Sequence, residues 1–323
     1  MLGYLLRRLF HMAITLFAMI TLMFFLFRML PGDPTATVIS PALDAEAREA
    51  MRIRFGLDRP LLEQYLVYLV NLAQLDFGLS FRTSGPVWDL IEGRLTNTLA
   101  LILPSMITAY AIGALGGALI AWYRGGKAEA GIVFAATTLQ SAPVFWLCML
   151  AILFFSIKLD LFPTGHIVSP GSFPEPSWRM YVSADFLHHL ALPFLVNTIY
   201  QLCFPLLLMR STMLSTIGED YVELARMKGL SERRVLLGHA MRNSLLPLAT
   251  TLPMILGLAV AGSVVIETVF SWPGLGLLMV EGITQADYPL VQGAFLLIAV
   301  LTVLGTFAAD LLYGLLDPRI VYR

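Results

Sequence analysis

The amino-acid sequence predicts an all-α, polytopic membrane protein with six transmembrane helices. Of its 323 residues, 58% are hydrophobic and only 13% are charged, whereas a soluble domain has about 45–50% apolar and about 25% charged residues. The mean hydropathy is correspondingly high, at +0.77. In addition, six stretches are long and apolar enough to cross a bilayer, which takes about 20 such residues.

These stretches define the order of the predicted spans. They cover residues 10–29, 98–122, 131–157, 190–209, 245–269 and 290–312. The first is too long for the core of a signal peptide, so we expect it to be a retained helix. Four spans contain proline, which a buried bundle tolerates because neighbouring helices satisfy the freed carbonyls. Gly113, Gly116 and Gly117 predict that the second span approaches another helix closely.

The distribution of Lys and Arg predicts that both termini lie in the cytoplasm, because short cytoplasmic loops are enriched in these residues. In that orientation the short outer loops carry only Lys158 and Arg179. The inner segments carry Arg7, Arg8, Arg124, Lys127, Arg210, Arg226, Lys228, Arg233, Arg234, Arg242, Arg319 and Arg323.

We expect two regions along the chain. Residues 1–97 form an N-terminal transmembrane helix followed by an extracytoplasmic helical segment, and residues 98–323 form a five-helix core. Within the first region, Ser40-Pro41 favours the start of a short helix that Gly56 would end, and residues 63–75 form a second, amphipathic helix.

The core contains a basic cytoplasmic loop at residues 210–243. Thr216 and Glu219 have the spacing of a capping box, and Gly229 could end the resulting helix in a left-handed conformation. Ser231 could begin another helix running to about Arg242. Two short helices joined at a glycine suit docking to another protein, and a solvated basic loop is the alternative interpretation.

Motifs that would make the chain an enzyme are absent from the sequence. It has no G-x-x-x-x-G-K-[ST], no H-E-x-x-H and no G-x-S-x-G. We therefore expect no catalytic residue, cofactor or metal, although His166, His188 and His189 could form an outer metal site if they are not simply interfacial histidines. Cys148 and Cys203 are expected to be buried hydrophobes. The net charge of -1 argues against a nucleic-acid partner.

Few ionisable residues fall within the predicted spans. Arg28, Glu267 and Asp310 all lie near span ends, whereas an ion-coupled secondary transporter more often carries such groups near the midplane. An ion-coupled secondary transporter is nonetheless the main alternative class for this protein. A membrane-embedded enzyme and a purely structural subunit are further alternatives.

Glu267 is followed by a turn rich in glycine and proline. We expect this acid and the turn to form part of an outer gate, with Trp272 at the membrane interface, or else a purely structural hairpin. The gate candidates are Glu267, Trp272, Pro273, Gly274, Gly276 and Asp287.

Several motifs together resemble one protein family. The stretch from Glu223 to Gly229, Glu-Leu-Ala-Arg-Met-Lys-Gly, resembles the EAA loop of ABC importer permeases, although Leu224 replaces an alanine and Pro247 comes later than usual. That longer spacing is similar to the peptide/nickel branch of the family. Further stretches that resemble this branch are Pro31-Gly-Asp-Pro34, Phe55 to Pro60, Asp76 to Arg82, Pro143 to Trp146, Glu219-Asp-Tyr221, Glu267 to Gly276 and Asp287-Tyr-Pro289.

The resemblance implies a type I ABC importer permease of the first-permease type, in a bacterial inner membrane. Its implied partners are a second, different permease, two ATPase subunits that hold ATP and Mg, and an extracytoplasmic solute-binding protein. Di- or oligopeptides are the implied cargo, with nickel, glutathione or opines as alternatives. The implied ATPase-coupling residues are Glu219, Asp220, Tyr221, Glu223, Ala225, Lys228, Gly229, Arg233 and Arg234.

Overall fold

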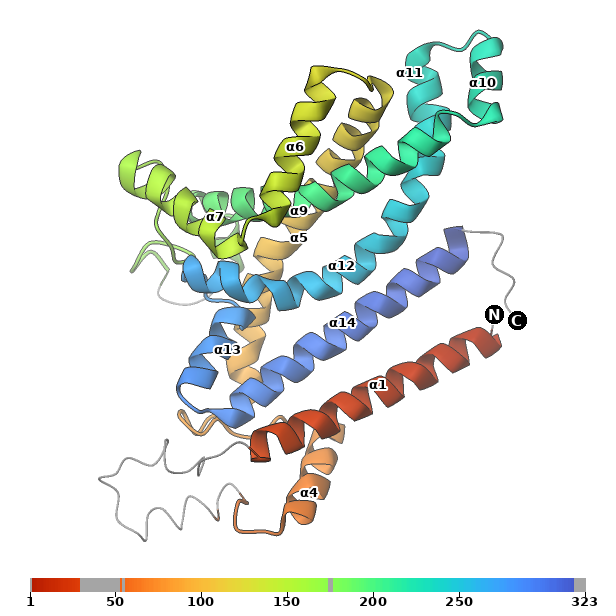
Figure 1. Ribbon diagram of the computed structural model, residues 1–323. Coiled ribbons are helices and arrows are strands. Elements are labelled where there is room, and N and C mark those ends of the chain that lie inside the picture. Colours follow the sequence, from red (N-terminus) through yellow and green to blue (C-terminus); the bar gives the residue numbers. More distant parts are fainter. Residues whose placement is uncertain (1, 30–52, 54–55, 174–176, 317–323) are drawn as a thin grey trace. The chain divides into compact units, whose positions relative to one another are not determined.

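The computed structural model describes residues 2–29, 53, 56–173 and 177–316, and these residues are mostly helical. They divide into two compact units (Figure 1). The first unit comprises Met1–Thr98 with Pro273–Val303, and the second comprises Leu99–Trp272 with Leu304–Arg323. Each unit is described by itself below.

The first unit is built around helix α1 (Leu2–Met29) and helix α4 (Leu61–Ala73). Phe24 of α1 is buried and contacts the rings of Tyr65 and Tyr68 of α4. The unit also holds the start of α5 (Val87–Trp122), all of α13 (Leu275–Thr284) and most of α14 (Tyr288–Leu316). The predicted amphipathic helix at 63–75 is therefore confirmed as α4.

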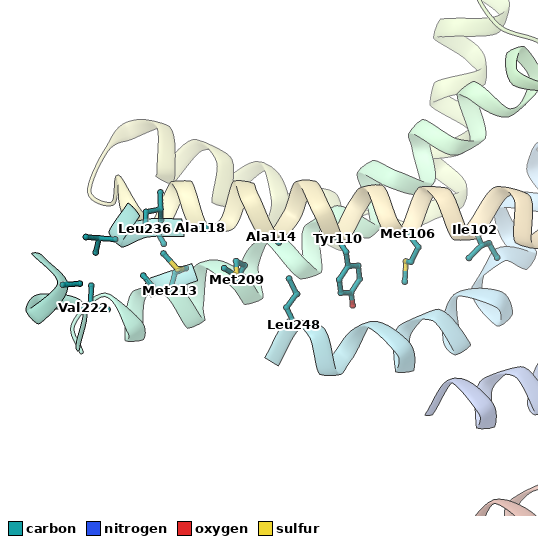
Figure 2. Packing of buried hydrophobic residues seen from close by; sticks show 14 residues of the cluster. Ile102, Met106, Tyr110, Ala114, Ala118, Met209, Met213, Val222, Leu236 and Leu248 are labelled. Atoms are coloured by element: carbon teal, nitrogen blue, oxygen red, sulfur yellow. The ribbon is translucent and has the colours of Figure 1, made fainter. Parts of the chain in front are cut away.

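The second unit contains the rest of α5, which packs against α9 (Ala184–Thr216) and α12 (Met241–Val269). Figure 2 shows this core, with Tyr110 of α5 pointing toward α12, which carries Leu248, and with Met209 of α9 in the same cluster. The predicted close approach at the glycines is confirmed. A Cβ on Gly117 would lie 2.4 Å from the carbonyl oxygen of Leu206 on α9.

Four described helices are long and apolar enough to cross a membrane, namely α1, α5, α9 and α14, and a bent pair makes a fifth if its two helices count as one span. The remaining predicted span, residues 245–269, lies within the 29-residue helix α12. The order of the predicted spans is thus the order of the long helices, with α9 extending well beyond both ends of its predicted stretch.

The predicted span at 131–157, which contains a proline, is not one continuous helix. Helix α6 (Lys127–Ser141) and α7 (Val144–Ala151), which continues into the π-helical segment η1 (Ile152–Lys158), are bent by 103° at the break between them. The break falls at Pro143, and the residue before a proline favours an extended conformation. Ala142 accordingly takes φ -75° and ψ 138°.

Some predictions lie outside the described residues. The helix expected after Ser40-Pro41, the Pro31-Gly-Asp-Pro34 motif, Phe55, and the last two arginines, Arg319 and Arg323, all fall there. The side chain of Asp310 does too. Gly56, which was expected to end that first helix, has a left-handed φ of +65°.

Candidate functional site

The predicted coupling loop forms a short helix, α10 (Asp220–Met227), that ends in a glycine turn. Gly229 has φ +77°, as predicted. Its amide donates to the Arg226 carbonyl at 2.9 Å, and the Leu230 amide donates to the Ala225 carbonyl at 3.4 Å. This pair of bonds is a Schellman motif, which satisfies the last carbonyls of a helix and favours glycine at the left-handed position.

Helix α10 has a buried face and an exposed apolar face. Val222 and Ala225 belong to the core cluster of the second unit, and Ala225 is only 4% exposed. Leu224 and Met227 point the other way and are 51% and 74% exposed. A helix that holds large apolar side chains in the open while its other face is packed is suited to docking in a groove of another protein.

Charged side chains surround this exposed apolar face. Arg226 lies over the ring of Trp122, with 5.0 Å from its guanidinium carbon to the ring centre, and its Nε is 3.3 Å from Glu232 Oε1. Arg226 was not among the predicted coupling residues, and the exposed members of that set are Glu219, Asp220, Tyr221, Glu223, Lys228, Gly229, Arg233 and Arg234. Ala225 is the one member of the predicted set that is buried.

Three details of the predicted loop are wrong. Thr216 does not cap α10, because it is the last residue of α9 and its hydroxyl donates to the Thr212 carbonyl at 2.8 Å. The helix expected from Ser231 to Arg242 does not end there, since α11 (Glu232–Arg234) and η2 (Val235–Ala240) continue into α12. Ala225, which was expected in the coupling surface, packs in the core of this chain, so neighbouring residues form the exposed surface of α10.

An ion pair that sequence reasoning missed lies at the base of this loop. Arg210, on α9, contacts Glu129 of α6, with Nη2 at 2.5 Å and Nε at 2.9 Å from Oε1. The other oxygen of Glu129 accepts a hydrogen bond from the Gly125 amide at 2.6 Å. That amide and the Arg210 side chain lower the pKa of the Glu129 carboxyl. The pair fastens the turn between α5 and α6 to α9.

A second missed contact lies between two spans. Asn197 of α9 donates from Nδ2 to the Ser105 hydroxyl on α5 at 2.6 Å, and that hydroxyl donates to the Leu101 carbonyl at 2.8 Å. All three residues are buried. A single Asn in an apolar stretch was the signal in the sequence, since polar side chains within membrane helices commonly bond to a neighbouring helix.

The predicted gate residues divide between the two units. Glu267, in the last turn of α12, and Trp272 belong to the second unit, whereas Pro273, Gly274, Gly276 and Asp287 belong to the first. Glu267 is 0% exposed. Trp272 does not present its ring to lipid within this chain, because the ring is fully buried against Phe186, with the ring centres 5.8 Å apart.

The turn that follows Glu267 is held by backbone contacts. Ser271 takes a left-handed φ of +48°, and the Trp272 amide donates to the Glu267 carbonyl at 2.8 Å. The carbonyl of Phe270 accepts from the His166 amide at 3.0 Å. Gly165 lies so close that a Cβ there would be 2.4 Å from the same carbonyl oxygen. The loop before α8 (Trp178–Tyr181) is thereby fixed to the end of α12.

The gate candidates of the first unit sit at the two ends of α13. Pro273 accepts a hydrogen bond from Asn97 Nδ2 at 2.8 Å, and Gly274 is the residue before the helix. Asp287 follows the other end and is buried. Its carboxylate accepts from the Ser80 hydroxyl and the Phe81 amide. These contacts show a structural role for Asp287 in joining two chain segments.

The three outer histidines do not form a metal site. Within the described part of the chain, no group of three or more His, Cys, Asp and Glu side chains could hold a metal ion. His189 Nδ1 instead lies 3.4 Å from Asp185 Oδ1, and that carboxylate accepts from the Ser169 amide and hydroxyl, each at 2.8 Å. Cys148 and Cys203 are buried free thiols, as expected.

Comparison with known families identifies the chain. Residues 113–322 match the model of the binding-protein-dependent transport system inner membrane component. The chain belongs to this family. Residues 1–102 match the N-terminal model for membrane components of the same systems. With these matches and its apolar helices, the chain is a multi-pass inner membrane protein.

Curated relatives match the permease over its full length. It is 37% identical over 339 residues to the di/tripeptide transport system permease protein DppB of Pseudomonas aeruginosa, covering 100% of both chains. It is also 37% identical over 323 residues to the oligopeptide transport system permease protein AppB of Bacillus subtilis, again covering 100% of both. The prediction of a permease of the peptide branch is confirmed.

The fold is also similar to a solved transporter. A chain of the MetNI methionine ABC transporter, in inward-facing conformations, aligns with a TM-score of 0.55 at 17% identity, covering 71% of this chain and 96% of that one. The predicted type I importer permease architecture is thus confirmed.

Proposed function

We propose that this permease translocates di- or oligopeptides that an extracytoplasmic binding protein delivers. The names of its full-length relatives support peptides as the cargo, with nickel, glutathione or opines as the alternatives. The chain acts as a translocation subunit, so ATP and Mg bind to two partner ATPases and this chain itself holds no cofactor. A second, different permease completes the pathway, and both termini face the cytoplasm.

The observation that carries the ATPase part of this proposal is the exposed apolar face of α10. Leu224 and Met227 are held in the open by the packing of Val222 and Ala225 and by the turn at Gly229. We assign this face to a groove on an ATPase subunit, where apolar anchors surrounded by charge are typical of a helix-in-groove contact. Arg233, Arg234 and Lys228 would then lie at the rim.

Co-purification tests the docking face directly. Leu224→Asp and Met227→Asp place a charge on the apolar face without touching the core, so an affinity-tagged chain should lose most of its bound ATPase. Val182→Asp is the matched control, because Val182 is similarly exposed, at 66%, but lies far along the sequence beside α8. Normal ATPase recovery with both α10 variants would refute the assigned surface.

The position of α12 supports a mechanical link to the gate. The helix runs from Met241, directly after the predicted coupling loop, to Glu267 in its last turn, a length of about 39 Å at 1.5 Å per residue. We propose that Glu267 and the turn up to Gly276 belong to the outer gate. We also propose that the gate belongs to a core formed by residues 98–323, to which residues 1–97 add an N-terminal region. Glu267→Gln should change transport per permease molecule. A loss of transport that only follows a loss of membrane-inserted protein would assign Glu267 to structure.

Reconstitution into vesicles tests the cargo and the partners. With the binding protein, ATPases, ATP and second permease present, a labelled dipeptide should accumulate, and unlabelled dipeptide should compete better than glutathione or nickel. Omitting the second permease should abolish uptake. Uptake driven by an ion gradient without ATPases would overturn the importer assignment, whereas uptake with this as the sole permease would overturn only the heterodimer.

A further inference from the structure

The first unit contains an apolar cavity of about 550 Å³ between membrane helices. Its volume falls in the range of roughly 300–1,000 Å³ that is typical of sites for small ligands. Every side chain that lines it is apolar. Helix α1 contributes two of them and α14 three, and the full set is Leu16, Ile20, Leu72, Leu75, Phe77, Trp88, Leu296, Leu297 and Val300.

A second cavity, of about 350 Å³, shares the wall residue Phe77 with the first and is polar and charged. Arg28 and Arg59 provide positive charge, and Asp76 provides a negative one. Tyr68, Asn71 and Gln64 of α4 add neutral polar groups. The Phe77 ring stacks on Trp88, with centres 5.5 Å apart. Phe77 thus belongs to the walls of both an apolar chamber and a charged chamber.

The two chambers are spaced like the parts of a lipid. Arg28 is the last residue of the apolar stretch Leu6–Arg28 of α1, whereas Ile20 and Leu16 lie two to three turns deeper. At 1.5 Å per residue the apolar chamber, which begins at the shared residue Phe77, extends along α1 to about 12–18 Å inward from Arg28. Half of a hydrocarbon core that is about 30 Å thick is about 15 Å. The apolar chamber therefore lies at the depth of the acyl chains of one leaflet.

The geometry points to a binding site for one phospholipid whose zwitterionic headgroup bears a primary ammonium, such as phosphatidylethanolamine. An acyl chain fills the apolar chamber, and Arg28 and Arg59 bind the phosphate, since guanidinium groups match phosphate oxygens well. The ammonium donates to Asp76.

The charges around the polar chamber agree with this assignment. Asp76 Oδ1 accepts the Gly78 amide at 2.8 Å, which fixes the carboxylate at the chamber wall. Arg59 Nη1 is 3.4 Å from Glu63 Oε1, and both side chains are about half exposed, so this pair is weak and can exchange for a phosphate. An acidic headgroup without a cation would leave Asp76 facing a like charge.

Quenching of Trp88 fluorescence tests the site in the assembled importer. The complex is placed in phosphatidylcholine nanodiscs that contain increasing fractions of lipid with brominated acyl chains, and the Trp88 signal is obtained by subtracting the Trp88→Phe variant. Brominated phosphatidylethanolamine should quench at a fraction at least roughly tenfold lower than brominated phosphatidylcholine, since one hydrogen bond from a charged group distinguishes them.

Two variants test the separate contributions of the phosphate-binding and ammonium-binding residues. Arg28→Gln should weaken quenching by both lipids, and Asp76→Asn should remove only the difference between them. Arg94→Gln is the control, because Arg94 belongs to the same unit and lines neither chamber, lying 3.8 Å from Glu281. Equal quenching by the two lipids in the unaltered protein would overturn the proposal. Stronger quenching by brominated phosphatidylglycerol would do so too, and the absence of quenching by all three would mean that protein fills the cavity.

Discussion

The Ser80 hydroxyl donates a hydrogen bond of 2.5 Å to Asp287 Oδ2, although the two residues are 207 positions apart in the chain. The Phe81 amide donates to Oδ1 of the same carboxylate at 3.0 Å. Both Ser80 and Asp287 are buried. The carboxylate therefore joins the segment before α5 to the turn between α13 and α14.

Removing this carboxylate should destabilise the protein. Asp287→Ala takes the acceptor from two buried donors, so we expect a loss of about 1–3 kcal/mol in the free energy of unfolding. The measurement is thermal or denaturant unfolding in detergent. A double-mutant cycle with Ser80→Ala provides the control, because the two losses should be less than additive if the bond is real. Strictly additive losses would contradict the contact.

The ion pair between Glu129 and Arg210 should make stability depend on pH. The Gly125 amide and Arg210 lower the pKa of Glu129 below its ordinary value of 4.5. A group with a lowered folded pKa contributes stability above its unfolded pKa, and that contribution is lost as the pH falls through the folded value.

The melting temperature of Glu129→Gln measures this effect. The variant should melt below the unaltered protein at neutral pH, and the gap should close as the pH falls below 4.5. Glu63→Gln, which removes the exposed pair with Arg59, should show little difference at either pH, because exposed ion pairs contribute little. A gap that persists unchanged in acid would contradict the assigned pKa.

Position 229 has room for a larger side chain, but a residue there must adopt a left-handed backbone conformation. A Cβ there would meet nothing within 4 Å, but φ is +77°, so Gly229→Ala should cost about 1 kcal/mol through backbone strain alone. Asn accepts the left-handed region better than other residues, so Gly229→Asn should retain more transport than Gly229→Val. Gly218→Ala, in the same loop and without a positive φ, is the control. Equal transport by all three Gly229 variants would exclude a role for the turn.

A substitution at Gly117 should destabilise the protein for a different reason, namely a steric clash with α9. Its Cβ position lies 2.4 Å from the Leu206 carbonyl oxygen, so Gly117→Ala must push α5 and α9 apart and should cost about 1–3 kcal/mol by overpacking. Gly131→Ala on α6 is the matched substitution, since its Cβ position is open and alanine favours a helix. The yield of folded protein in mild detergent compares the two, and equal yields and melting temperatures would contradict the close approach.

Local signals in the sequence were enough for much of the fold and for one part of the candidate site. Apolar stretches of about 20 residues predict membrane helices because the bilayer sets their length. The glycine at the end of the coupling helix is equally local, since a left-handed residue is needed within one turn of the last carbonyls. Gly229 and the exposed ring of charges around α10 could therefore be predicted without any tertiary contact.

Proline shows where local signals stop being sufficient. Pro104, Pro193 and Pro205 lie inside the continuous helices α5 and α9, whereas Pro143 separates two helices by 103°. The local chemistry of these prolines is the same. Whether a helix continues depends on neighbours that satisfy the freed backbone groups, and those neighbours come from other parts of the chain.

The sequence by itself therefore determined the class of protein, the order of its helices and the place of the loop that carries α10, because each depends on residues close together in the chain. Only the tertiary structure decided that Ala225 and Trp272 turn inward, that Glu129 pairs with Arg210, and that Asp287 accepts from Ser80. Burial and pairing depend on which distant segment lies against a side chain, and the pattern of residues around that side chain does not carry this information.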